Sequence, residues 1–116
     1  MRTLLPGLAV VALAGMLATG GLVRAQENEA EALYSRYHQA IEAAKQCRNV
    51  SFDQNAHDRM AAVISKQIHH SIGAKRLPLL TAAQRETRDI VRKHGCGDSR
   101  ITELLALFDA DLAPVL

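Results

Sequence analysis

After residue 26, apolar residues recur at intervals of three and four and do not alternate with a period of two. This spacing places apolar side chains on one face of an α-helix, whereas a half-buried strand requires alternation. Four successive segments show the helical spacing: 30–47, 52–72, 80–94 and 101–112. The sequence therefore predicts an all-α fold, a small up-down four-helix bundle built of three to four helices.

Signals for helix ends separate these segments. Ser51 with Gln54, and a similar pair beginning at Thr81, match the capping box that satisfies free backbone N–H groups at a helix start. Gly73 and Gly95 follow the second and third segments, where glycine commonly ends a helix. Short links favour antiparallel neighbours, so we expect the chain to run up-down-up-down. Three helices with a docked terminal segment are the alternative.

The first 25 residues have the three parts of a secretory signal peptide. Arg2 gives a positive start, the central stretch is uncharged and apolar, and residues 23–25 form the small-x-small pattern that signal peptidase recognises. We therefore expect cleavage before Gln26, and a single helical domain over 26–116 in the periplasm. A retained anchor is the alternative, because about twenty uncharged residues can cross a bilayer.

Removal of the leader changes the charge balance. The full chain has 14 Lys and Arg against 12 Asp and Glu, and the loss of Arg2 and Arg24 makes the mature chain neutral. A neutral domain has no general attraction for nucleic acid or anionic lipid, so neither is an expected partner. No later apolar run is long enough for a stable membrane span. Aromatic residues are scarce, and a domain this small is expected to need a covalent staple.

Cys47 and Cys96 are the only cysteines in the sequence. Exported compartments are oxidising, and an even cysteine count in a short exported chain indicates a disulfide. An up-down path also brings the ends of the first and third helices together, which places these two residues close to each other. The alternative is a redox pair or a pair of metal thiolates, although catalytic pairs are usually spaced Cys-x-x-Cys.

Five histidines in an exported chain suggest a divalent metal as a possible cofactor. Asp53, His57 and Met60 lie at i, i+4 and i+7, where Asp and His could share one ion and Met would suit copper. His69 and His70 are a second candidate set, although adjacent helical side chains diverge by about 100°. The alternative places Met60 in the core, Asp53 at a helix start and the histidines at the surface.

The histidines also suggest a response to acid. Several of them would gain charge between pH 7 and 5, and the resulting self-repulsion could loosen a small alanine-rich bundle. Such loosening would expose its apolar face. The alternative is that any chain with this composition titrates in the same way without a functional consequence.

Arg85, Arg88 and Arg92 repeat at intervals of three and four and are candidates for contact with an acidic partner. The alternative is a solvated helix face on which Asp89 pairs with its neighbours. The sequence contains no nucleophile elbow, zinc-protease motif, phosphate loop or haem-attachment motif. We therefore expect no enzymatic activity and no catalytic residues.

The segment from Leu80 to Gln84, with sequence LTAAQ, resembles the LTxxQ motif of the Spy/CpxP family of periplasmic chaperones and stress regulators. In size, helical plan and cysteine spacing, the chain is also similar to the HdeA-type periplasmic acid-stress chaperones. Both resemblances imply ATP-independent protection of unfolded clients, and neither supplies site residues.

Together these features predict a small exported, non-enzymatic binding protein that is stress-related or chaperone-like. It would act through helix-face contacts with a protein partner or an unfolded client. A periplasmic metal-binding protein and an accessory subunit of an exported complex are the alternatives.

Overall fold

The computed structural model describes residues 27–69 and 72–116, and the regular elements in these ranges are all helical. The expected signal peptide, residues 1–25, lies outside the described residues. Residues 27–48 form one long helix, referred to below as the 27–48 helix. It is followed by α2 (Gln54–Gln67), the 3-10 turn η1 (Gly73–Lys75), α3 (Arg76–His94), α4 (Ser99–Leu107), the π-helical turn η2 (Phe108–Leu112) and the 3-10 turn η3 (Ala113–Val115). The predicted all-α fold with four helices is confirmed within these residues.

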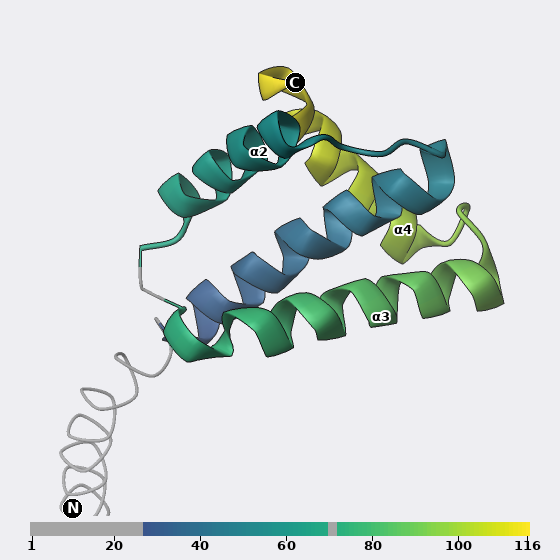
Figure 1. Cartoon of the computed structure of the whole chain (residues 1–116). Helices are drawn as coiled ribbons and strands as arrows, with labels where there is room; N and C mark the ends of the chain where they lie inside the picture. Colours follow the sequence, from purple (N-terminus) through teal and green to yellow (C-terminus); the bar gives the residue numbers. More distant parts are fainter. Residues whose placement is uncertain (1–26, 70–71) are drawn as a thin grey trace, which may run out of the picture.

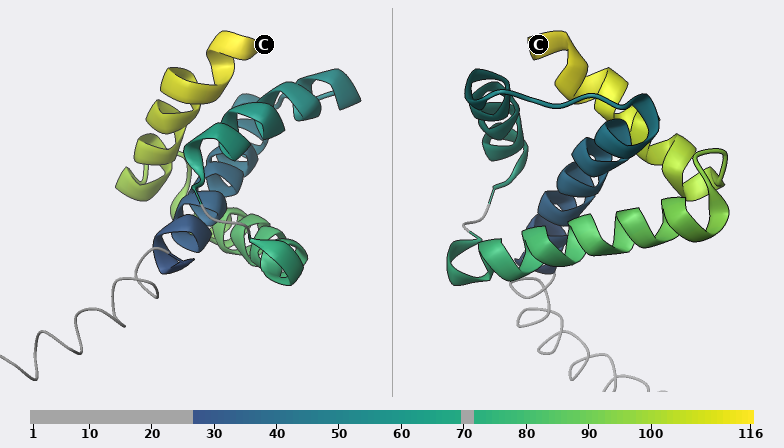
Figure 2. Two further views of the ribbon diagram at one scale, coloured as in Figure 1. Left: turned by 90° about the vertical axis from the view of Figure 1, so that its left-hand side faces the viewer. Right: turned by 45° about the vertical axis from the view of Figure 1, so that its right-hand side comes forward.

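The 27–48 helix lies at the centre of the arrangement (Figure 1). α2 runs back along one side of it, α3 lies on the opposite side, and α4 with the C-terminal turns covers a third side (Figure 2). The central position requires a helix that is buried over much of its circumference. Its buried apolar residues are mostly small or aromatic: Ala30, Tyr34, Tyr37, Ala40, Ile41, Ala43 and Ala44.

The surrounding elements contribute the rest of the core at the expected helical spacing. The buried residues are Met60 and Ile64 from α2, Ala83 and Thr87 from α3, Ile101 and Leu104 from α4, and Phe108 and Leu112 from η2. The small alanines of the central helix allow neighbouring helices to approach closely while the larger Met, Ile and Leu side chains fill the space between them.

The capping box predicted at Ser51 is wrong. α2 begins at Gln54, and Asp53 caps it by accepting a hydrogen bond from the backbone N–H of Ala56 at 2.8 Å. An ionised carboxylate at this position satisfies a free donor and also suits the positive end of the helix dipole. α2 also ends at Gln67, before the predicted end of the segment at residue 72.

The second predicted capping box, at Thr81, is also wrong because α3 already begins at Arg76. Pro78 lies in the first turn of α3, where the N–H that proline lacks would have no intrahelical partner. Gly73 does not end α2 and instead opens η1, with a φ of 62°. The end of α3 is as predicted, since Gly95 follows it with a φ of 81°.

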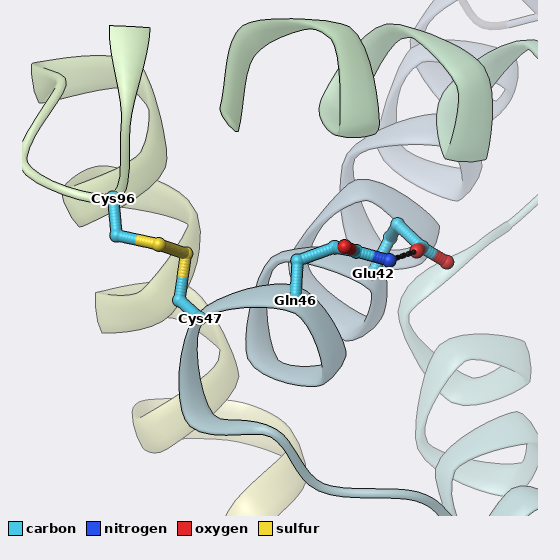
Figure 3. Close-up of a disulfide and its surroundings, with 4 residues drawn as sticks. All are labelled: Glu42, Gln46, Cys47 and Cys96. Atoms are coloured by element: carbon cyan, nitrogen blue, oxygen red, sulfur yellow. Dashed lines mark hydrogen bonds between the residues drawn. A yellow bond between two sulfur atoms is a disulfide. The ribbon is translucent and has the colours of Figure 1, made fainter. Parts of the chain in front are cut away.

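The predicted disulfide between Cys47 and Cys96 is present, with an S–S distance of 2.03 Å and a Cα–Cα distance of 5.8 Å (Figure 3). Cys47 lies in the last turn of the 27–48 helix, and Cys96 lies in the link between α3 and α4. The two residues meet because the helices that precede them finish at the same end of the bundle. The bond therefore joins α3 covalently to the central helix.

Candidate functional site

Polar pairs fasten the 27–48 helix to the C-terminal turns. The guanidinium of Arg48 donates two hydrogen bonds to the carboxylate of Asp109, at 2.5 and 2.8 Å. The hydroxyl of Tyr37 donates to Asp111 Oδ2 at 2.5 Å. Burial of the ring, together with this bond and the negative charge of Asp111, raises the pKa of Tyr37 to about 12, so the hydroxyl stays protonated as a donor.

A buried carboxylate fastens α3 to the same central helix. Glu42 is 1% exposed, and its Oε2 accepts hydrogen bonds from Gln46 Nε2 at 2.7 Å and from Arg88 Nε at 3.1 Å (Figure 3 shows Glu42 and Gln46). Lys45 Nζ lies 3.8 Å from the other carboxylate oxygen. A carboxylate tolerates this degree of burial only when such partners replace water.

α2 is attached differently. Its buried residues Met60 and Ile64 are apolar, and the half-buried residues at its two ends, Phe52 and Ile68, are apolar as well. The Phe52 ring lies against that of Phe108, with centroids 5.7 Å apart. Between residues that the structure describes, no side-chain hydrogen bond or ion pair joins α2 to another helix. Apolar contact is therefore what holds α2 in place.

The three arginines proposed as a binding stripe are not equivalent. Arg88 reaches the buried Glu42, and Arg92 donates a hydrogen bond to Asp89 one turn earlier on α3. Arg85 is exposed and makes no ion pair with any residue that the structure describes. Two of the three charges are thus already compensated within the molecule, one of them by a buried partner.

Two of the three residues in the first predicted metal set have structural roles in α2. Asp53 is occupied as the cap of α2, and Met60 is fully buried in the core. His57 is exposed and meets the edge of the Phe52 ring, with centroids 6.1 Å apart. The helical spacing of these residues is as predicted, but the carboxylate and the thioether are both occupied elsewhere.

The second predicted metal set is only partly described. His69 is exposed just after the end of α2, and His70 lies outside the described residues. Within residues 27–69 and 72–116, no group of three or more His, Cys, Asp or Glu side chains is placed to hold a metal ion.

A pocket of about 400 Å³ lies between the 27–48 helix, the C-terminal half of α2 and the start of α3. Ile64, Ile68 and Ile72 supply its apolar lining. Polar side chains also line it, among them His38 from the central helix and Arg76 at the start of α3. A concave surface with an apolar wall and a few polar groups is the usual form of a small-molecule or side-chain binding site.

Neither His38 nor Arg76 of this pocket was singled out by the sequence analysis. His38 is half-buried, and its ring lies 4.5 Å from that of Tyr34 between centroids. Burial, together with the positive charges of His57 and Arg76, lowers the pKa of His38 from 6.5 to about 4. The imidazole is therefore neutral at neutral pH. The available signal was its position one turn after Tyr34, beside the buried stripe of the central helix.

Comparisons with protein-family models, with curated proteins and with solved structures found no match to this chain. No helix in the described ranges has both the length and the apolar character needed to cross a bilayer. The candidate site is a pocket beside α2, which apolar contacts hold in place, in a bundle whose other helices are joined by a disulfide and ion pairs.

Proposed function

We propose that this chain is a small non-enzymatic binding protein, exported to the periplasm, that protects unfolded clients in a chaperone-like manner. The observation that carries the proposal is the unequal attachment of the helices. The 27–48 helix, α3 and the C-terminal turns are joined by a disulfide and buried or bidentate ion pairs, whereas α2 is held by apolar side chains. α2 is therefore the helix that can separate without unfolding the others.

Separation of α2 would uncover apolar surface on both sides of the interface. Met60 and Ile64 would become accessible on α2, and Tyr34 and Phe108 would lose cover on the remaining helices. A contiguous apolar patch of this kind binds exposed apolar segments of other proteins. The client would thus occupy the surface that α2 covers in the closed form.

Acid would favour this separation. His38 lies beneath α2, with His57 and His69 on the α2 side, Arg76 on the α3 side and Tyr34 on its own helix. A proton on His38 would add charge to a half-buried site that already faces Arg76. Charging a buried imidazole beside another cation is unfavourable, so α2 would dock less tightly as the pH falls.

A client-aggregation assay at pH 7.5 and pH 4 tests the proposal. We expect suppression of aggregation at pH 4 and little at pH 7.5. Met60→Ala should extend suppression of aggregation to pH 7.5. The loss of this fully buried side chain should destabilise the packing of α2 against the other helices by about 2–5 kcal/mol.

Ile101→Ala is the matched control for this assay. It removes an equally buried side chain from α4, so it should lower stability by a similar amount without releasing α2 selectively. Equal suppression by both variants would mean that general unfolding, rather than α2 release, exposes the binding surface. No suppression by the wild type at either pH would overturn the chaperone proposal.

A further inference from the structure

The pocket beside α2 has a charge asymmetry that points to a particular kind of ligand. Arg76 lines it and makes no ion pair with any described residue, whereas the adjacent Lys75 is paired with Glu31 at 3.1 Å. No aspartate or glutamate occurs among the described residues that line the pocket. Among the residues that the structure describes, the pocket therefore offers a guanidinium without an ion-pair partner and no carboxylate to neutralise it.

The groups near Arg76 are suited to an anionic head group. Tyr34 and His38 line the pocket together with Arg76, and the positive charge of Arg76 lowers the pKa of both side chains. Burial raises the pKa of Tyr34, so its hydroxyl remains a donor. A guanidinium fork with a neighbouring hydroxyl is a favourable environment for a carboxylate, which can accept several charge-assisted hydrogen bonds.

The remaining lining is suited to a hydrocarbon chain. Ile64 and Ile72 are buried, with exposed fractions of 3% and 9%, and Ile68 is half-buried beside them. The volume of about 400 Å³ falls in the range of pockets that hold small molecules. A partner helix is about 10–12 Å across and needs a longer groove, so a small molecule fits this pocket better than a protein element does.

We propose that this pocket binds a small amphiphile with one anionic head group, such as a medium-chain carboxylate. Arg76 holds the head, and Ile64, Ile68 and Ile72 hold the chain. The bound molecule would bridge α2, the central helix and the start of α3. This inference does not depend on the chaperone proposal, because it concerns the closed form of the molecule.

Calorimetric titration at pH 7.5 with three probes of equal chain length tests the inference on the full-length protein with its disulfide intact. The probes are decanoate, decanol and decyltrimethylammonium. We expect saturable binding of decanoate, binding of decanol weaker by about tenfold or more, and weaker binding still of the cation. Equal affinity for decanoate and the cation would overturn the proposal, as would absence of binding by all three.

Variants separate the roles of head and chain. Arg76→Gln should weaken decanoate binding by about tenfold while leaving decanol binding unchanged, because only the charged contact is lost. Ile68→Ser should weaken the binding of both decanoate and decanol, because it removes part of the apolar lining. Arg59→Gln removes an exposed charge from α2 outside the pocket and should leave both affinities unchanged. Decanoate binding that is unchanged by Arg76→Gln would contradict the role of Arg76 as the site of the head group. The comparison of the three probes on the wild type tests the preference for an anionic head group without any variant.

Discussion

The Nε atom of Arg88 on α3 lies 3.1 Å from a carboxylate oxygen of Glu42, which is buried on the central helix. The arginine side chain remains largely exposed, so only one of the two charges is withdrawn from water. Removal of the arginine would leave the buried carboxylate with Gln46 and the more distant Lys45. The pair therefore matters more for stability than an ordinary surface ion pair does.

Arg88→Ala should lower the free energy of unfolding by about 2–4 kcal/mol, because it leaves a buried charge with too few partners. Arg85→Ala is the matched control, since this exposed residue on the same helix has no ion pair among described residues. It should change stability by no more than about 0.5 kcal/mol. Urea denaturation measures the free energy of unfolding of both variants. A similar decrease for the two would show that the ion pair between Arg88 and Glu42 contributes little to stability.

Reduction of the disulfide should lower stability by about 4 kcal/mol in the chain-entropy model, because the bond joins residues 49 apart in sequence. The sequence contains two cysteines, so a reductant acts on this bond alone. Urea unfolding with and without dithiothreitol measures the effect, and the double variant Cys47→Ser with Cys96→Ser should reproduce it. A urea midpoint unchanged by reductant would contradict the expected role of the bond.

Stability should fall as the pH decreases from about 6.5 to about 4, in part because of His38. Its pKa is lowered from 6.5 in the unfolded chain to about 4 in the folded one, so the unfolded chain binds the proton first. This contribution is complete above pH 6.5 and is lost below about pH 4. Because the ring is half-buried, solvent screening reduces it to the order of 1 kcal/mol.

His38→Leu isolates that contribution from the titration of the carboxylates. Urea unfolding at pH 7.5, 5 and 4 should show a shallower loss of stability for this variant than for the wild type. His94→Gln replaces an exposed histidine on α3 and should follow the wild-type profile. If both variants show the wild-type slope, the half-buried imidazole of His38 does not contribute to the loss of stability in acid.

The helical spacing was sufficient to predict the main elements and most of the core. Tyr34, Met60, Ile101 and Phe108 are buried as their spacing indicated, because a helix that covers another must turn its apolar stripe inward. The disulfide could be predicted because it required only the chain direction of successive helices. Helix starts were predicted less well, since Asp53 and Ser51 are both capable caps and the path of the preceding chain decides between them.

The site was largely hidden from the sequence because its groups come from different helices. Glu42 occupies a position that a charge would normally hold at the surface, and its burial depends on Arg88, which is 46 residues away. His38 similarly acquires its low pKa from cover supplied by α2 and from the approach of Arg76. Neither relation has a local pattern in the sequence. The spacing of Asp53, His57 and Met60 is a local pattern, but Asp53 caps α2 and Met60 is buried in the core.

The weak polar attachment of α2 predicts that its backbone amides exchange with solvent earlier than those of α3. α2 has two buried side chains and is held by apolar contacts, whereas α3 is fastened by the disulfide just beyond its C-terminal end and by Arg88 in its middle. Regions with few stabilising contacts open at lower free energy than the rest of a domain.

Hydrogen–deuterium exchange at pH 7 and pH 5 should therefore show less protection over 56–67 than over 80–93. After correction for intrinsic rates, the difference in protection between the two helices, called the gap below, should be larger at pH 5. His38→Leu should narrow the gap at pH 5. Equal protection of the two helices at both values would mean that the bundle opens as one unit and that α2 is not the releasing element.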